Sequence, residues 1–420
     1  MIVFVKKVIL FLWCNAKIVQ MFYPRAILQP LIDHLTHKQV TVLTGMRRTG
    51  KTTLVKRLIE LSEAGHKVYF DLERLDNREL FSDKNYENII LALQLRGIDF
   101  SQRVLIAIDE IQLAPNLPSV IKYLYDNYDI KFILTGSSSY YLKNQFNESL
   151  SGRKKIFEIY PLSFGELLAF KEVTFSSTGH FTERPFLRSE YERLKSYYEE
   201  YIQFGGFPEV VLSPAIQDKK DLIQDILSSY INLDIALLTD FKKTSDVYKL
   251  IKLLAPRVGS KMDVSKITNI TTMSRTMVEN YLDFFEQSYL IASIPVTSSN
   301  VDREIVKARK FYFLDNGFAS VLSETSSGAQ FENAVFNQLR NFGEVSYYQL
   351  KTGKEIDFVV DKAMAFEVKE TAAPADLNNL LGLSKNLGIS RNFVIGRRPN
   401  QIFQGFIWGD LYNNLFRVNQ

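Results

Sequence analysis

The stretch that decides the fold is LTGMRRTGKTTLV, residues 43–55. Residues 40–44 form a mostly β-branched run that predicts a strand, and apolar residues recur at helical spacing over residues 52–61. The residues between them follow the spacing Gly-x-x-x-x-Gly-Lys-Thr, in the order strand, loop and helix. In that context the N–H groups at the helix N-terminus face phosphate groups. The sequence therefore predicts a phosphate-binding loop.

Each residue type in this loop has a chemical role. Lys51 adds a positive charge beside the β- and γ-phosphates of a nucleotide, and the hydroxyl of Thr52 is a predicted Mg²⁺ ligand. For Arg47 and Arg48 the alternatives are contact with nucleotide, contact with a neighbouring subunit, or a solvated loop. The predicted nucleotide-binding residues are Gly45, Met46, Arg47, Arg48, Thr49, Gly50, Lys51, Thr52 and Thr53.

A second motif, RVLIAIDEIQ at residues 103–112, supports the first. Residues 104–108 predict a buried strand that ends in two adjacent acids, at the sheet edge where ligands of open α/β sheets bind. We predict that Asp109 holds Mg²⁺ through water and that Glu110 polarises the attacking water. A water-activating glutamate distinguishes a nucleotide hydrolase from most P-loop kinases. The two motifs together predict Mg²⁺-dependent nucleotide hydrolysis.

Two later segments carry candidate residues for the same reaction. The strand expected over residues 131–135 leads into TGSSS, so Thr135 or Ser137 can present a polar group beside the γ-phosphate, as the sensor residue of AAA+ proteins does. Arg153 precedes a strand expected over residues 156–160. It suits an arginine finger acting on nucleotide in an adjacent subunit of a homo-oligomer, and the alternative is an ordinary loop arginine.

The chain resembles prokaryotic AAA+ family ATPases in which a P-loop domain is followed by a DUF4143 region. The motifs that carry the resemblance, in order, are TGMRRTGKTTL, IAIDEIQ, LTGSSS, SLSGRKK, YPLSFGELL, GGFPEVV, KFYFLDNGF, FENAVFNQLR, GKEIDFVV and FEVKE. The resemblance implies binding and hydrolysis of ATP with Mg²⁺ and a cytoplasmic location. It also implies a C-terminal fold similar to PD-(D/E)XK nucleases.

Composition sets limits on these expectations. A chain of 420 residues predicts two or three domains, and a net charge of +4 does not indicate a general polyanion binder. The single cysteine, Cys14, excludes an internal disulfide framework and fits a reducing, cytoplasmic compartment. Residues 1–20 resemble the start of a signal peptide, but their apolar run is too short to span a bilayer. We interpret them as an extension outside the fold and expect no membrane partner.

The middle of the chain reads as helical. Residues 186–204 have helical spacing and end at the breaker cluster GGFP, which we interpret as the end of an ATPase lid, and an amphipathic helix is expected over residues 219–238. Residues 246–296 then predict helix, helix and strand, an order that resembles a winged helix. Glu279 and Asp283 on the second helix oppose contact with DNA phosphates, so we favour contact with protein.

A second candidate site lies in residues 306–370, where RKFYFLD, VSYYQL, IDFVVD and AFEVKE predict strands around the helix FENAVFNQLRNF. A tight hairpin would bring Asp357 beside Glu367 and Lys369, which point to one face of a strand. Paired carboxylates suit Mg²⁺ or Mn²⁺, and a lysine beside them can position or deprotonate the attacking water. Glu332 on the preceding helix would complete the acidic cluster.

Two hypotheses follow for the whole chain. In one, the C-terminal domain cleaves DNA or RNA as a metal-dependent nuclease; in the other, it is a catalytically silent binding module attached to an ATP-driven switch. The predicted fold class is α/β, with a helical and winged-helix-like region between two α/β domains. Its expected parts are an extension (1–20), a P-loop AAA+ ATPase core (21–170), a helical lid (171–215), a helical and winged-helix-like region (216–305) and a restriction-endonuclease-like PD-(D/E)XK domain (306–420).

Overall fold

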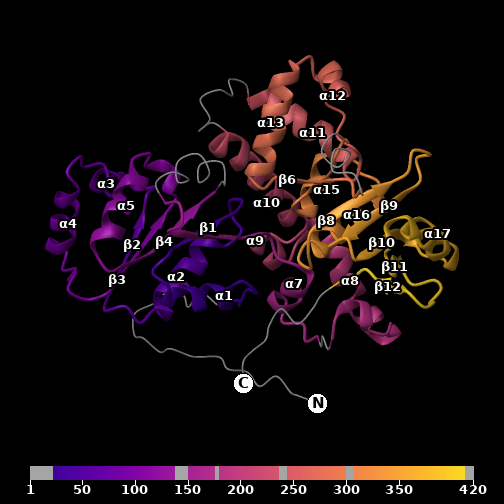
Figure 1. Cartoon of the computed structure of the whole chain (residues 1–420), viewed down its shortest axis with the longest axis horizontal. Coiled ribbons are helices and arrows are strands. Elements are labelled where there is room, and N and C mark those ends of the chain that lie inside the picture. Colours follow the sequence, from indigo (N-terminus) through magenta and orange to yellow (C-terminus); the bar gives the residue numbers. More distant parts are fainter. Residues whose placement is uncertain (1–21, 138–149, 176–178, 236–243, 299–306, 412–420) are drawn as a thin grey trace.

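The computed structural model describes residues 22–137, 150–175, 179–235, 244–298 and 307–411. Two sheets lie at opposite ends of the long axis, one from the N-terminal part of the chain and one from the C-terminal part (Figure 1). Helices from the middle of the chain lie between the sheets and above them in this view. No helix in the described ranges is long and apolar enough to cross a membrane.

The N-terminal sheet is parallel, in the order β2-β3-β4-β1-β5. Its strands are β1 (Val40–Thr44), β2 (His66–Asp71), β3 (Val104–Asp109), β4 (Ile130–Gly136) and β5 (Lys154–Glu158). Its helices are α1 (Leu28–Asp33), α2 (Lys51–Leu61), α3 (Leu75–Leu80), α4 (Tyr86–Leu95) and α5 (Leu117–Asn127). Because β4 lies between β1 and β3, the carboxyl ends of these three strands meet at one edge, where ligands of such sheets bind.

The predicted strands of this sheet are present, with one shift. The strand expected over residues 156–160 begins two residues earlier, at Lys154. The reason is pairing with β1: Val40 N–H donates to the Arg153 carbonyl at 2.8 Å, and Val40 is in register with Lys154. The predictions for the strand over residues 40–44 and the helix that follows it are confirmed.

The middle of the chain is helical, as expected. Its elements are α7 (Phe164–Phe170), α8 (Arg188–Phe204), α9 (Pro208–Leu212), α10 (Ile216–Ser229), α11 (Thr244–Leu254), α12 (Val264–Thr271), α13 (Arg275–Gln287), β6 (Ile291–Ile294) and β7 (Lys310–Phe313). The helix expected over residues 219–238 is shorter: α10 ends at Ser229 and continues as a π-helical turn, η4 (Tyr230–Asp234). Residues 236–238 lie outside the described ranges.

The C-terminal part is a five-stranded mixed sheet in the order β12-β11-β10-β9-β8. Its elements are α15 (Asn316–Leu322), α16 (Ser327–Leu339), β8 (Val345–Gln349), β9 (Glu355–Val360), β10 (Met364–Thr371), α17 (Pro374–Ser384), β11 (Arg391–Arg398) and β12 (Phe406–Trp408). The strand expected in RKFYFLD is present as β7, and it pairs antiparallel with β6. Short 3₁₀ turns are η1 (His34–Thr36), η2 (Ile111–Leu113), η3 (Phe181–Glu183), η5 (Ala255–Arg257) and η6 (Lys385–Leu387).

One continuous apolar core joins the middle and C-terminal parts, from Leu162 to Leu411. Helix α8, expected in a separate lid, packs against α15 and α16. For example, the buried ring of Tyr198 lies 5.6 Å from the Trp408 ring, centroid to centroid. The largest apolar cluster therefore spans the ranges expected for the lid, the middle region and the C-terminal domain, and a smaller cluster lies within the C-terminal sheet. The domain boundaries remain a prediction.

Candidate nucleotide site

The phosphate-binding loop connects β1 to α2 in a conformation that requires glycine. Gly45 has φ +148°, and an added Cβ would lie 2.1 Å from the Ile159 carbonyl oxygen. Gly50 is the N-cap of α2 with φ +94°, a conformation that L side chains rarely adopt. These two glycines set the loop so that α2 begins at Lys51.

Lys51 is buried, and its ammonium group stays at the loop. Its Nζ donates hydrogen bonds to the carbonyl oxygens of Gly45 (2.7 Å) and Met46 (2.9 Å). Burial lowers the pKa of Lys51, while the nearby carboxylates of Glu110 and Asp234 counteract that shift. A buried cation of this kind is strongly stabilised when an anion binds beside it.

The predicted magnesium-binding pair is in contact. Thr52 Oγ1 donates a hydrogen bond to Asp109 Oδ2 at 2.6 Å, which joins the start of α2 to the end of β3. Asp109 is buried and also accepts hydrogen bonds from Tyr69 Oη (2.8 Å) and Thr135 Oγ1. Hydroxyl and carboxylate oxygens are the donors that Mg²⁺ prefers. Both predicted ligands are thus fixed at one point beside the loop.

Glu110 follows Asp109 with its backbone in the left-handed region, at φ 57° and ψ 49°. Such a conformation is uncommon for a residue other than glycine and is concentrated at functional sites. Its N–H donates to Thr135 Oγ1 (3.1 Å), and Gln112 Nε2 donates to its side chain at Oε2. Burial raises the pKa of Glu110, whereas Lys51 and other cations counteract that shift. The raised pKa suits a group that accepts a proton.

Arg47 and Ser137 meet a residue that the sequence did not single out, Asp234. Arg47 Nε donates to Asp234 Oδ1 at 2.9 Å, and Ser137 Oγ donates to the same oxygen at 2.8 Å. Asp234 is buried and comes from the π-helical turn that follows α10. The predicted sensor strand and the phosphate-binding loop therefore share one carboxylate from the middle of the chain.

Arg48 and Arg153 lie elsewhere. Arg48 Nη1 is 3.1 Å from Glu209 Oε2 at the surface. Arg153 pairs with Asp126 at 3.0 Å and immediately precedes β5, so it lies at the edge where the parallel strands begin. The phosphate-binding loop is at the opposite edge, and the five residues of β1 span about 16 Å. Arg153 is therefore remote from the loop of its own chain.

A cavity of about 690 Å³ lies beside the loop. Its polar wall includes Arg47, Lys51 and Thr52, together with Glu110. Its apolar wall is formed by Phe22, Tyr23, Phe170, Pro208, Leu212 and Leu233. Tyr23 and Phe170 stack with ring centroids 4.8 Å apart. A cavity of this size that is lined by both cationic and aromatic side chains suits a ligand that combines phosphate groups with a flat ring system.

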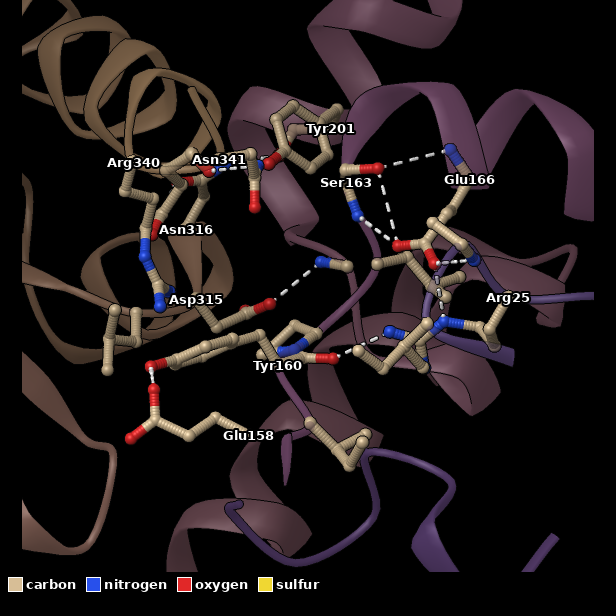
Figure 2. Close-up of a pocket in the computed structure, with 18 of the residues that line it drawn as sticks. Arg25, Glu158, Tyr160, Ser163, Glu166, Tyr201, Asp315, Asn316, Arg340 and Asn341 are labelled. Carbon is tan, nitrogen blue, oxygen red and sulfur yellow. Dashed lines mark hydrogen bonds and ion pairs between the residues drawn. The ribbon is translucent and has the colours of Figure 1, made fainter. Parts of the chain in front are cut away.

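A second cavity of about 230 Å³ lies at the junction with the C-terminal part (Figure 2). Arg340 lies on one side, with its guanidinium 3.4 Å from the Tyr160 ring centroid, and Arg25 lies on the other. Arg25 forms a buried ion pair with Glu166 at 2.8 Å and donates to the carbonyl oxygens of Thr49 (2.9 Å) and Tyr160 (2.8 Å). Because Arg25 lines both cavities, it joins the phosphate-binding loop to this junction.

The C-terminal candidate residues are also close together. The β9–β10 pairing places Phe358 opposite Phe366, and Asp357 Oδ2 accepts a hydrogen bond from Val368 N–H at 2.8 Å. The hairpin predicted from the spacing is therefore present. Lys369 Nζ lies 2.6 Å from Glu367 Oε1 on the same strand.

Glu332 on α16 completes the group through electrostatics and hydrogen bonds. Its Oε1 accepts a hydrogen bond from Tyr312 Oη at 2.8 Å and lies 3.8 Å from Lys310 Nζ. Burial and the carboxylate of Asp357 raise the pKa of Glu332 to about 7. In the described part of the chain, no three or more His, Cys, Asp or Glu side chains are arranged to hold a metal ion. The acids here are instead paired with lysines and a tyrosine.

The sheet order and this site define the N-terminal part as an AAA-type, P-loop ATPase-like domain. Comparison with known families agrees, because residues 37–168 match a family described as an AAA domain. Residues 195–329 match a domain of unknown function (DUF8612), and residues 327–408 match a second one (DUF4143). The resemblance to AAA ATPases followed by a DUF4143 region is confirmed to that extent.

Two proteins with similar sequences are named only as uncharacterized proteins. One from Methanocaldococcus jannaschii is 28% identical over 338 residues, which cover 78% of this chain and 73% of that protein. One from Haemophilus influenzae is 27% identical over 383 residues, covering 86% and 90%. Their names assign no activity, so the function of this chain has to be argued from its site.

Among solved structures, the chain matches a Walker-type ATPase of Pyrococcus abyssi. It has a TM-score of 0.42 and 17% identity, over 72% of this chain and 96% of that one. Another is the RuvB Holliday junction branch migration motor of Thermotoga maritima, with a TM-score of 0.33 and 14% identity over 65% and 90%.

Proposed function

We propose that this chain binds ATP with Mg²⁺ at the phosphate-binding loop and hydrolyses it. The observation that carries the proposal is the joint position of Lys51, Thr52, Asp109 and Glu110 at one edge of the sheet. The aromatic residues that line the adjacent cavity support an adenine base, because Tyr23 and Phe170 contribute ring surfaces to it.

The residues divide the chemistry between binding and water activation. Lys51 and the N–H groups at the start of α2 bind the β- and γ-phosphates. Thr52 and Asp109 would hold Mg²⁺, which when bound offsets the phosphate charge. Glu110 accepts a proton from the attacking water. The water oxygen forms a bond to the γ-phosphorus, and the bond between the γ-phosphorus and the β–γ bridging oxygen breaks. The products are ADP and inorganic phosphate, which takes up the proton.

Nucleotide binding is tested by titrating ATP with Mg²⁺ into the wild-type chain and into Lys51→Ala. We expect binding to the wild type and none to the variant, because Lys51 is the buried cation of the loop. Equal binding by both would refute the site. Asp126→Ala, a change at the opposite edge of the sheet, serves as a control for nonspecific effects on binding.

A second candidate function belongs to the C-terminal sheet, where we infer metal-dependent cleavage of DNA or RNA. The specific observation is the β9–β10 hairpin, which brings Asp357 beside the strand that carries Glu367 and Lys369. Glu332, Asp357 and Glu367 would hold Mg²⁺ or Mn²⁺, which when bound would activate water for cleavage of the phosphodiester. The competing account is a silent binding module, favoured by the pairing of Glu367 with Lys369 at 2.6 Å.

The two accounts of the C-terminal sheet differ in a cleavage assay. Labelled single- and double-stranded DNA and RNA are incubated with Mg²⁺ or Mn²⁺, with and without ATP, using wild type and Asp357→Ala. Cleavage by the wild type that the variant lacks supports the nuclease. ATP turnover without cleavage under any condition supports the silent module. Asp361→Ala, in the hairpin turn, controls for disturbance of the hairpin itself.

A further inference from the structure

The contacts of Asp234 connect the nucleotide site to the middle of the chain. Asp234 Oδ1 accepts hydrogen bonds from Arg47 Nε and Ser137 Oγ, and the side chain is 97% buried. Arg47 and Asp234 are 187 residues apart in sequence. A buried carboxylate is costly unless it is paired, so these two contacts hold the turn against the loop.

The terminal N–H groups of Arg47 are available to donate hydrogen bonds to a ligand. Its terminal nitrogens lie 3.7 Å from Glu73 and 3.8 Å from Glu110, distances beyond the range of hydrogen bonds. In the described part of the chain these terminal nitrogens have no hydrogen-bond acceptor, and Arg47 lines the cavity beside the loop. A guanidinium held by Nε presents its other N–H groups as a fork, which matches phosphate oxygens.

The other end of the same turn is fixed to the middle region. Tyr230, the first residue of η4, shares a hydrogen bond of 2.6 Å with Ser288 at the C-terminal end of α13. The Tyr230 ring stacks on Phe284 of α13 with centroids 6.1 Å apart. One π-helical turn therefore touches α13 at its first residue and the phosphate-binding loop at its last. Single π-helical turns of this kind are frequent at functional sites.

We propose that Asp234 is a positioning residue that aims Arg47 at the γ-phosphate and so couples this phosphate to the π-helical turn. The proposal rests on the proposed binding of ATP. When ATP is bound, the γ-phosphate engages the terminal N–H groups of Arg47 while Asp234 holds Nε. Arg47 then links the γ-phosphate to the π-helical turn, and this link restricts the movement of the turn and of α13. ADP lacks the γ-phosphate and leaves the turn held by Asp234 alone.

Two measurements test this coupling in the full chain. The first is the ratio of affinities for the β,γ-imido analogue of ATP and for ADP. We expect Arg47→Gln and Asp234→Ala to lower that ratio by about tenfold, because each variant loses a charge-assisted hydrogen bond to the γ-phosphate. Asp234→Asn retains the Oδ1 acceptor and should give an intermediate ratio. Asp225→Ala, an exposed acid on α10, should leave it unchanged.

The second measurement is hydrogen exchange of the amides in the π-helical turn. In the wild type we expect slower exchange with the imido analogue than with ADP, and no such difference in Asp234→Ala or Arg47→Gln. A folding defect would change exchange with both nucleotides equally, so the difference isolates the coupling. Wild-type affinity ratios and exchange differences in both variants would overturn this inference alone. Failure of the wild type to bind either nucleotide would overturn the proposed ATP site as well.

Discussion

The ion pair between Arg25 and Glu166 is the buried contact that we expect to matter most for stability of the N-terminal part. Their side chains are only 7% and 6% exposed, and Glu166 also caps α7 through Ser163. Arg25→Met leaves a buried carboxylate without its cation, and breaking such a pair costs about 3–5 kcal/mol of unfolding free energy. The lost hydrogen bonds to the Thr49 and Tyr160 carbonyls favour the upper end of that range.

The pH dependence of this loss has a definite sign. Burial alone would raise the pKa of Glu166, but Arg25 and the backbone donors hold it below its ordinary value of 4.5. A depressed pKa contributes stability above the unfolded value, and that contribution disappears as pH falls through the folded value. In Arg25→Met burial alone raises the pKa of Glu166, so as pH falls its carboxyl is protonated in the variant before it is protonated in the wild type. The difference in stability should therefore begin to shrink above pH 4.5 and continue to shrink below it.

Urea unfolding measured by fluorescence and circular dichroism gives the free energies, taken from the first transition because the chain has several parts. Arg74→Met breaks an exposed pair with Asp76 and should leave the transition unchanged. The double variant Arg25→Met with Glu166→Gln should lose less than the sum of the single losses, because the pair is removed together. A loss in Arg25→Met no greater than in Arg74→Met, or strict additivity, would refute the reasoning.

Three further predictions concern the nucleotide site. Gly45→Ala should abolish ATP binding, measured by titration, because its Cβ would lie 2.1 Å from a main-chain carbonyl oxygen. Burial raises the pKa of Glu110 and Arg47 counteracts this, so Arg47→Gln should move the acid limb of the turnover–pH profile to higher pH. No movement, or movement to lower pH, would refute that interaction. Arg153→Ala should lower turnover with little change in ATP affinity, and mixing it with Lys51→Ala should restore turnover if the arginine acts in a neighbouring subunit. Reduced turnover in a chain shown to be monomeric would contradict that trans action.

Local sequence patterns were sufficient for the elements around the phosphate-binding loop. The strand over residues 40–44 and the start of α2 follow from a β-branched run, glycine spacing and helical periodicity, all within about twenty residues. The hairpin that joins Asp357 to the strand of Glu367 followed from a short separation in sequence for the same reason. The partner of β7 could not be predicted in this way, because its sequence pattern indicates a strand but not the strand with which it pairs. Only the tertiary structure shows that β7 pairs with β6.

Long-range contacts could not be predicted in this way. Asp234 stands at the end of a helical pattern, where a single acid reads as a solvated residue, yet it is buried against a loop 187 residues earlier. Arg25 is similar, because its partner Glu166 is 141 residues away. One weak signal existed, because the pair of arginines inside the phosphate-binding loop needs counter-charges. Residue types alone do not say which acids supply them.

The measurement that tests the central claim most directly is release of phosphate from ATP by the purified wild-type chain and by Glu110→Gln, with ATP affinity measured on both. Our account predicts steady turnover by the wild type. The variant should bind ATP with similar affinity and release almost no phosphate, because it lacks the group that accepts the proton of water. Equal turnover by the two proteins, or no turnover by the wild type with Mg²⁺ present, would contradict the assignment of Glu110 and the proposed hydrolysis.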